Sequence, residues 1–128
     1  MDIKKLQKIV VTALEDIKGR DIEVLNTSKL TSLFDRIVIA SGDSNRQVKA
    51  LARSVHDKVT EAGGEVLSTE GEDNGEWVLV DLGDIVVHVM QPAVRIHYNL
   101  EELWSARPTA RSRKKAAEDA DGESNAAA

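Results

Sequence analysis

The stretch of residues 77–90 reads Trp-Val-Leu-Val-Asp-Leu-Gly-Asp-Ile-Val-Val-His-Val-Met, two apolar runs around a Gly-Asp dipeptide. Apolar runs of this length that are rich in β-branched residues and separated by a two-residue turn signal are typical of a β-hairpin. Gly83-Asp84 suits a type II′ turn, which takes glycine at its first central position. We therefore expect two antiparallel strands, over residues 76–82 and 85–91.

This turn determines which side chains share a face, because side chains alternate along a strand. One face, here called the aliphatic face, is expected in the core; it carries Val78, Val80, Leu82, Ile85, Val87 and Val89. The opposite face, here called the mixed face, pairs Trp77 with Met90, Leu79 with His88 and Asp81 with Val86. Trp and Met are favoured at binding surfaces, so we expect Trp77 and Met90 to stay accessible. The alternative is that a helix of the same chain covers the mixed face.

The remaining segments follow from hydrophobic period, caps and turn residues. Spacings of three and four predict two long helices, and Pro92 opens a last helical stretch. The expected elements are helices over 3–18, from Asp43 or Ser44 to 62, and over 92–104, with strands over 21–26, 36–40 and 65–68, a loop or single helical turn over 27–34, and a polar loop over 69–75. The order α-β-β-α-β-β-β-α predicts a mixed sheet packed with helices, in an α/β or α+β single domain.

Composition limits the class of protein. The chain has 128 residues, 41% of them hydrophobic and 30% charged, which fits one ordinary domain. It contains no cysteine, so disulfides, thiolate metal sites and cysteine nucleophiles are excluded. The first residues do not form an uninterrupted apolar stretch, so we expect no secretory signal and a cytoplasmic location.

Charge is unevenly distributed along the chain. The formal net charge of the chain is -5. Residues 106–128 have a net charge of +1, so the first 105 residues have a net charge of -6. An acidic body favours a basic protein partner over bare nucleic acid. The last 23 residues have alanine as their only apolar type, which predicts a disordered charged tail over 106–128 behind a folded domain over 1–105.

Catalytic interpretations of the sequence are weak. Glu76, Asp81 and Asp84 are close enough to suggest a magnesium site, yet nothing in their spacing makes the carboxylates converge. His56, His88 and His97 lack the spacing of metal ligands. The segment 41–45, Ser-Gly-Asp-Ser-Asn, enters a helix as phosphate loops do, but helix capping explains it better. We expect no catalytic residue, no metal and no cofactor.

Several segments together resemble the ribosome silencing factor family, also called the Iojap-like family. They are residues 34–48 (Phe-Asp-Arg-Ile-Val-Ile-Ala-Ser-Gly-Asp-Ser-Asn-Arg-Gln-Val), Glu70-Gly71, residues 76–90, and residues 95–104 (Arg-Ile-His-Tyr-Asn-Leu-Glu-Glu-Leu-Trp). The resemblance covers roughly residues 3–104, in order and with plausible spacing.

This resemblance implies a binding protein with a fold similar to nucleotidyltransferases but without their catalytic acids. It implies a repressor that binds the large ribosomal subunit through its fourteenth ribosomal protein when nutrients are scarce, and sterically blocks joining of the small subunit. It also implies a homodimer. Carried onto this chain, the contact surface would comprise Trp77, Leu79, Asp81, Leu82, Gly83, Asp84, His88 and Met90.

Two other functions stay open from the sequence. One is a nucleotidyltransferase-like, magnesium-dependent enzyme that uses Asp81 and Asp84. The other is a general RNA-binding accessory protein, which the acidic body disfavours and which would depend on the basic block Arg111–Lys115.

Overall fold

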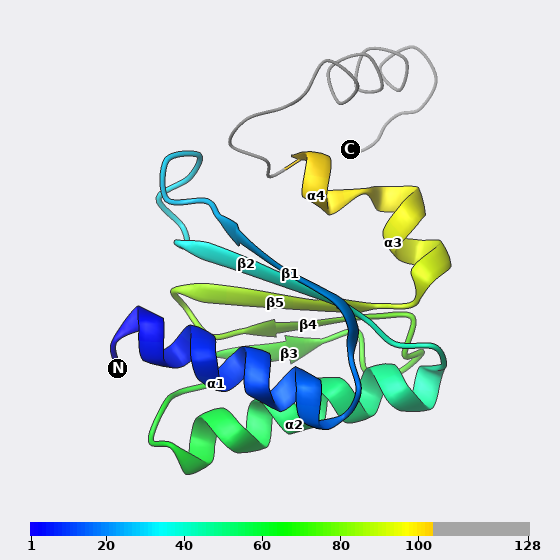
Figure 1. The fold of residues 1–128 in the computed structure, drawn as a ribbon, viewed down its shortest axis with the longest axis horizontal. Coiled ribbons are helices and arrows are strands. Elements are labelled where there is room, and N and C mark those ends of the chain that lie inside the picture. The colour runs from blue at the N-terminus through cyan, green and yellow to red at the C-terminus, as the bar shows by residue number, and fades with distance from the viewer. Residues whose placement is uncertain (104–128) are drawn as a thin grey trace.

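The computed structural model describes residues 1–103, in which a five-stranded sheet has helices on both sides (Figure 1). Its elements are α1 (Ile3–Asp16), β1 (Arg20–Asn26), β2 (Arg36–Ser41), α2 (Asn45–Glu61), β3 (Ser68–Glu70), β4 (Trp77–Asp81), β5 (Ile85–Met90), α3 (Pro92–Tyr98) and α4 (Leu100–Leu103). The strand order is β1-β2-β5-β4-β3. Strands β2 and β5 run parallel, and the other neighbouring pairs are antiparallel. The predicted mixed sheet of a small α+β domain is confirmed.

Both long helices begin where a short polar side chain caps the backbone. Asp2 accepts a hydrogen bond from the Lys4 N–H at the start of α1. At the start of α2 the Ser44 hydroxyl accepts one from the Gln47 N–H, at 3.1 Å. Such caps satisfy backbone N–H groups that have no partner within the helix. Of the two expected caps for α2, the structure selects Ser44 and leaves Asp43 for an ion pair with Arg20.

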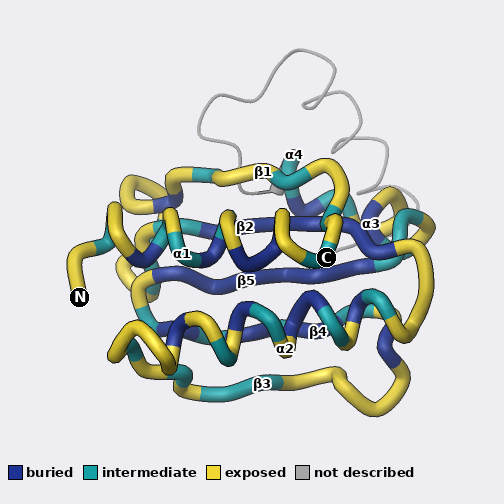
Figure 2. The backbone as a smooth tube through the Cα atoms, turned by 60° about the horizontal axis from the view of Figure 1, so that its bottom comes forward, coloured by how far each residue is buried: buried dark blue, intermediate teal, exposed yellow. Residues whose placement is uncertain are grey.

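Helices α1 and α2 pack side by side over the aliphatic face of the sheet (Figure 2). All six hairpin residues predicted for the core are buried there, from 0% to 8% exposed. Leu51 of α2 is fully buried, and its methyl groups would lie only 3.0 and 3.1 Å from a Cβ added at Gly19 or Gly42. The two glycines therefore allow α2 to approach the chain segments on either side of it.

The hairpin has the predicted register. Trp77 lies opposite Met90, Leu79 opposite His88, and Asp81 opposite Val86. Gly83 has φ +90°, a left-handed value that suits glycine in this turn. The turn is held by the Leu82 N–H, which donates to the Ile85 carbonyl at 2.9 Å, and by the Gly83 N–H, which donates to the Asp81 carboxylate at 2.9 Å.

Some element bounds differ from the prediction. The short strand expected over 65–68 is β3, over 68–70, because pairing with β4 sets its place: the Leu67 N–H already donates to the Asp81 carbonyl. The last helical stretch breaks at Asn99, which is left-handed with φ +50°. The predicted tail over 106–128 and the end of the last helical stretch at Trp104 lie outside the described residues. No helix in the described part of the chain is both long and apolar enough to cross a membrane.

Candidate binding surface

The mixed face of the sheet is formed by β4, β5 and β2 together. Parallel pairing places Ile37 beside Val86, Ile39 beside His88, and Ser41 beside Met90. The run Ile37-Val38-Ile39, which lies in the strand predicted over 36–40, therefore supplies side chains to both faces, and all three are fully buried. Helices α3 and α4 lie on this side, opposite α1 and α2 (Figure 1).

One end of the mixed face is covered by a small apolar cluster. Met90 packs with Ile37, Ile39 and Leu100, and Val94 and Phe34 lie against this group. Met90 is fully buried, so the expectation that it stays accessible is wrong. The physical reason is its place at the end of β5, because α3 begins two residues later and folds back over it.

Trp77, by contrast, is only partly covered. Its indole N–H donates to Nδ1 of His88 at 3.0 Å, and its ring lies 4.8 Å from the ring of Tyr98, tilted by 47°. Contacts on two sides hold the indole in one orientation. A rigid, partly exposed aromatic side chain loses little entropy when a partner covers it.

The bond from Trp77 also determines the protonation of His88. Nδ1 accepts the indole proton, so the imidazole is neutral and carries its own proton on Nε2. His88 is 7% exposed, and burial lowers its pKa from 6.5 to about 4. His88 is a buried cross-strand residue, and the predicted pairing with Leu79 is confirmed.

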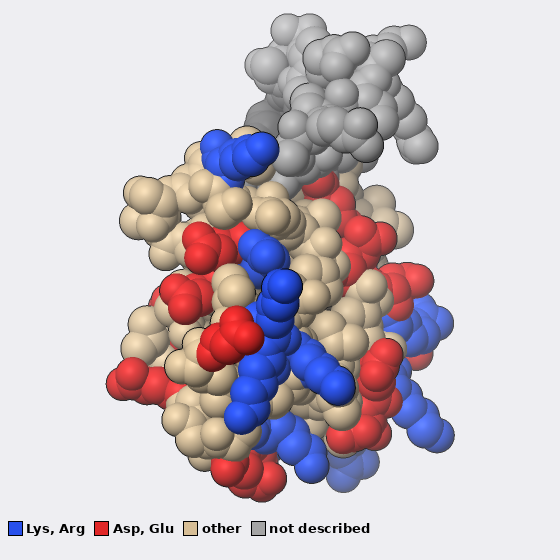
Figure 3. Space-filling model, turned by 60° about the vertical axis from the view of Figure 1, so that its left-hand side comes forward, with Lys and Arg blue, Asp and Glu red and all other residues tan. Residues whose placement is uncertain are grey.

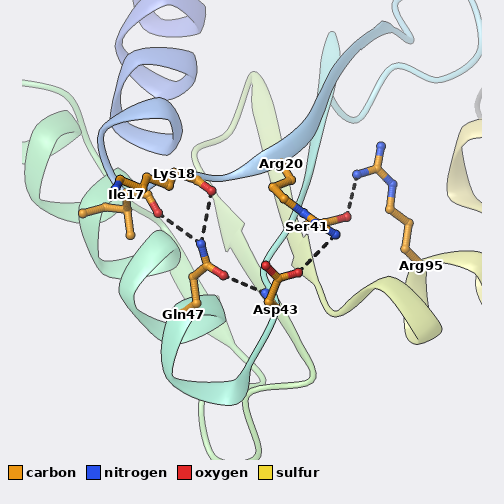
Figure 4. A network of polar contacts seen from close by, with 7 residues as sticks. All are labelled: Ile17, Lys18, Arg20, Ser41, Asp43, Gln47 and Arg95. Carbon is orange, nitrogen blue, oxygen red and sulfur yellow. Dashed lines mark hydrogen bonds and ion pairs between the residues drawn. The ribbon is translucent and has the colours of Figure 1, made fainter.

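A buried arginine fastens α3 and α4 to the sheet. The Arg95 guanidinium donates to the Ser41 hydroxyl at 2.9 Å (Figure 4). It also donates twice to one carboxylate oxygen of Glu101, at 2.8 and 3.0 Å. Arg95 is 8% exposed, and the ion pair satisfies its charge in place of water. Sequence analysis quoted Arg95 and Glu101 only within a resemblance, because nothing in their spacing shows that the chain turns back between them.

The first turn of α2 holds a second polar network, which positions the loop over 41–44. Gln47 donates to the carbonyls of Ile17 and Lys18 and accepts from the Asp43 N–H (Figure 4). Asp43 is paired with Arg20 at 3.1 Å. This loop therefore caps α2 through Ser44, as the capping interpretation predicted, and Asp43 and Gln47 also tie it to β1 and to the end of α1.

The acidic residues of the hairpin do not converge. One carboxylate oxygen of Asp81 accepts from the turn, whereas the Asp84 side chain is exposed. The Asp84 carbonyl accepts from the backbone N–H groups of Asp35 and Arg36 and so ties the turn to β2. Glu76 lies at the far end of β4 and is exposed. Within residues 1–103, no three His, Asp or Glu side chains are grouped so that they could hold a metal ion.

The eight predicted contact residues therefore separate by accessibility. Trp77, Leu79, Asp81 and Gly83 are partly exposed and Asp84 is exposed, whereas Leu82, His88 and Met90 are buried. Leu82 belongs to the aliphatic face, so it can only support the turn. The accessible five are here called the hairpin surface.

Sequence reasoning missed two exposed apolar residues of α3, one of which contacts the hairpin surface. Ile96 is 73% exposed and Tyr98 is 49% exposed, and the Tyr98 ring lies against Trp77. A helix of seven residues is too short for its hydrophobic period to separate buried from exposed side chains. A hollow of about 400 Å³ lies beside Ile96, and its lining includes Arg95 and the acidic residues Asp21, Glu23 and Glu101. Half-exposed apolar groups beside acidic ones form a surface suited to a basic protein partner.

The fold is that of a small α+β domain, and one face of its sheet retains accessible apolar and acidic side chains. The chain matches, over residues 1–128, the family model described as "Ribosomal silencing factor during starvation". A ribosomal silencing factor from Chromobacterium violaceum is 60% identical over 107 residues, which cover 84% of this chain and 88% of that protein. One from Bacillus subtilis is 42% identical over 110 residues, covering 86% and 93%.

Solved structures give the same result. A crystal structure of a Chromobacterium violaceum protein, 59% identical, aligns with a TM-score of 0.81 and covers 85% of this chain and 92% of its own. The chain belongs to the ribosomal silencing factor family.

Proposed function

We propose that this protein represses translation under nutrient limitation by binding the large ribosomal subunit, in the cytoplasm, through its fourteenth ribosomal protein. Bound there, the chain occupies space that the small subunit needs, so the two subunits do not join. The mechanism is steric occlusion and requires no chemical step. Membership of the silencing factor family supports this function, and the hairpin surface supplies the means of binding.

The observation that carries the proposal is the partly exposed Trp77, held by His88 and Tyr98 on the same hairpin as the accessible acidic groups of the turn end. Tryptophan is the residue type most enriched among those that dominate interface energies. Asp81 and Asp84 flank one end of the surface and can pair with Lys or Arg of a basic protein. Specific interfaces bury about 800 Å² on each partner, so α3 with Tyr98 would belong to the contact as well.

The test is co-sedimentation of the purified chain with isolated large and with isolated small subunits. We expect selective binding to the large subunit, and Trp77→Ala to weaken it by about 2 kcal/mol or more, roughly thirtyfold. Leu79→Ala should weaken it as well. Its matched control is Val24→Ala, since Val24 is an exposed aliphatic residue that pairs with buried Val38 and so lies outside the mixed face.

Binding of the Trp77→Ala chain at wild-type affinity, with its fold intact by circular dichroism, would remove Trp77 from the interface. If neither subunit binds the wild-type chain, the proposal fails. A melting experiment with nucleotide and Mg²⁺ would then test the enzyme alternative, because a ligand that binds only the folded state raises the melting temperature. We also propose that the same surface forms the contact of a homodimer. Large subunits would then compete for this surface, so adding them should dissociate the dimers observed by sedimentation velocity.

A further inference from the structure

The charge of this chain is divided between its two sides. Helices α1 and α2 carry seven basic and four acidic side chains, a net of +3. The other residues among the first 105 carry five basic and fourteen acidic ones, a net of -9. The acidic net charge therefore belongs to the sheet and its loops, and the two-helix layer has the opposite sign.

The basic side chains of this layer are exposed and available. They are Lys4, Lys5, Lys8, Arg46, Lys49, Arg53 and Lys58. The ion pairs found within residues 1–103 are Arg20–Asp43, His56–Asp57 and Arg95–Glu101, and none of the seven takes part in them. The acidic residues of the same helices are Glu15, Asp16, Asp57 and Glu61, which lie among them and limit the field.

Three of the lysines meet where α1 begins and α2 ends. A groove of about 450 Å³ lies between the helices, and its lining includes Lys5, Lys8 and Lys58. The other lining residues are Ile9, Thr12 and Asp16. Figure 3, which brings this end of the molecule forward, shows basic side chains running down the middle of the view, with acidic side chains on both sides of them.

Three more basic side chains form a line along α2. Arg46, Lys49 and Arg53 are spaced by three and four residues, so they share one side of the helix. From Arg46 to Arg53 the helix rises about 10 Å, at 1.5 Å per residue. One strand of a nucleic acid duplex presents about three phosphates over that length, at roughly 3.4 Å each along the axis.

The layer lacks the features of a protein-docking surface. The large hydrophobic side chains of α1 and α2 are buried or only partly exposed, and the partly exposed ones are Ile3, Ile9 and Val11. Protein interfaces depend on buried aromatic or aliphatic anchors, whereas binding to a phosphate backbone needs only distributed cations.

We propose that the α1–α2 layer is a second binding surface, which contacts the phosphate backbone of RNA while the hairpin surface binds protein. This inference rests on the proposed function, since a ribosomal subunit offers both kinds of surface. The RNA contact alone is weak because the whole chain carries -5. Once the hairpin surface has docked, the contact becomes intramolecular and adds to the overall affinity.

The test measures binding of the full chain to a labelled RNA duplex of unrelated sequence, by fluorescence anisotropy over a range of salt concentrations. We expect the double variant Lys8→Glu/Arg53→Glu to weaken binding about tenfold or more and to reduce the salt slope by about 2. The matched control is Lys18→Glu/Lys29→Glu, which changes the net charge equally at exposed positions outside both helices. It should change affinity much less.

The outcomes separate this proposal from the proposed function. Trp77→Ala should still bind RNA but should lose its binding to the large subunit. The helix variant should lose its binding to RNA, and its affinity for the large subunit should fall several-fold. Equal losses in the helix variant and its control would mean that only net charge matters and would overturn the inference. If poly-glutamate competes as strongly as unlabelled RNA, the surface binds an acidic protein and the inference is overturned. If the wild type does not bind the duplex even at low salt, the inference is also overturned.

Discussion

The two faces of the sheet are built on different principles. The centre of the aliphatic face carries Val, Leu, Ile and Ala against two long helices, and there it is almost completely buried. The mixed face carries Trp77, Asp81, His88 and Ser41 among apolar groups, and α3 and α4 cover one end of it. The first face can do little except hold the fold together. The second retains accessible side chains that the fold does not require, which is where a binding function can be placed.

This comparison also shows how polar groups are kept on a buried face. His88 is satisfied by the indole of Trp77, and Ser41 by the guanidinium of Arg95. A buried polar group without a partner costs about 1–3 kcal/mol. Each polar residue of the mixed face therefore depends on one specific neighbour, and each pair gives a way to test the difference between the faces.

The largest expected effect is on the aliphatic side. Leu51→Ala should lower the free energy of unfolding by about 3 kcal/mol or more, because it empties a fully buried site between α2 and the glycines at 19 and 42. Leu79→Ala, at a half-exposed position of the mixed face, should cost less than about 1 kcal/mol. Urea unfolding of both variants measures this. Equal losses would mean that the two faces contribute alike to stability.

A second effect, nearly as large, depends on pH and belongs to the mixed face. His88 has a lowered pKa of about 4 in the folded chain and an ordinary pKa of 6.5 when unfolded. Between these pH values His88 is protonated in the unfolded chain but not in the folded chain. Its contribution to the free energy of unfolding is therefore fully present above pH 6.5 and falls as the pH drops towards 4. The full shift corresponds to about 3 kcal/mol.

The measurement is the unfolding free energy at pH 7 and at pH 4.5 for the wild type and for His88→Asn, which keeps an acceptor for the indole but does not titrate. We expect the wild type to lose more stability than the variant over this range. Parallel losses would show that carboxylates elsewhere, and not His88, cause the acid sensitivity.

The smallest effect concerns the covered end of the mixed face. Arg95→Met should cost about 2 kcal/mol, since it leaves Glu101 and Ser41 without their partner while keeping an apolar stem. Because α3 and α4 are the elements it fastens, amide hydrogen exchange should rise in Ile96, Leu100 and their neighbours and leave α2 unchanged. Uniform exchange increases throughout the chain would mean that Arg95 stabilises the whole domain and not this cover alone.

Periodicity accounted for much of the fold. The two-residue turn at Gly83-Asp84 determined the register of β4 and β5, and hence which six residues enter the core. Period and capping residues located α1 and α2 to within two residues or so. The short edge strand was misplaced because three residues carry no period of their own, and only pairing with Asp81 and Leu79 defines β3.

The candidate site was less predictable. Alternation placed Trp77 and Met90 on one face but could not tell which of them the chain itself covers. That depends on α3, whose break at left-handed Asn99 turns Leu100 back onto Met90. The link from Arg95 to Ser41 spans 54 positions, and no local pattern reports a contact of that range.

The sequence by itself determined the faces of the hairpin, because alternation and turn length are local properties of the backbone. It also determined the resemblance to the silencing factors, which the family match confirms. Only the tertiary structure decided which mixed-face side chains remain accessible, since accessibility depends on elements distant along the chain. The same holds for charge: a total of -5 is a property of the sequence, but its division into a basic helix layer and an acidic sheet side exists only once the chain has folded.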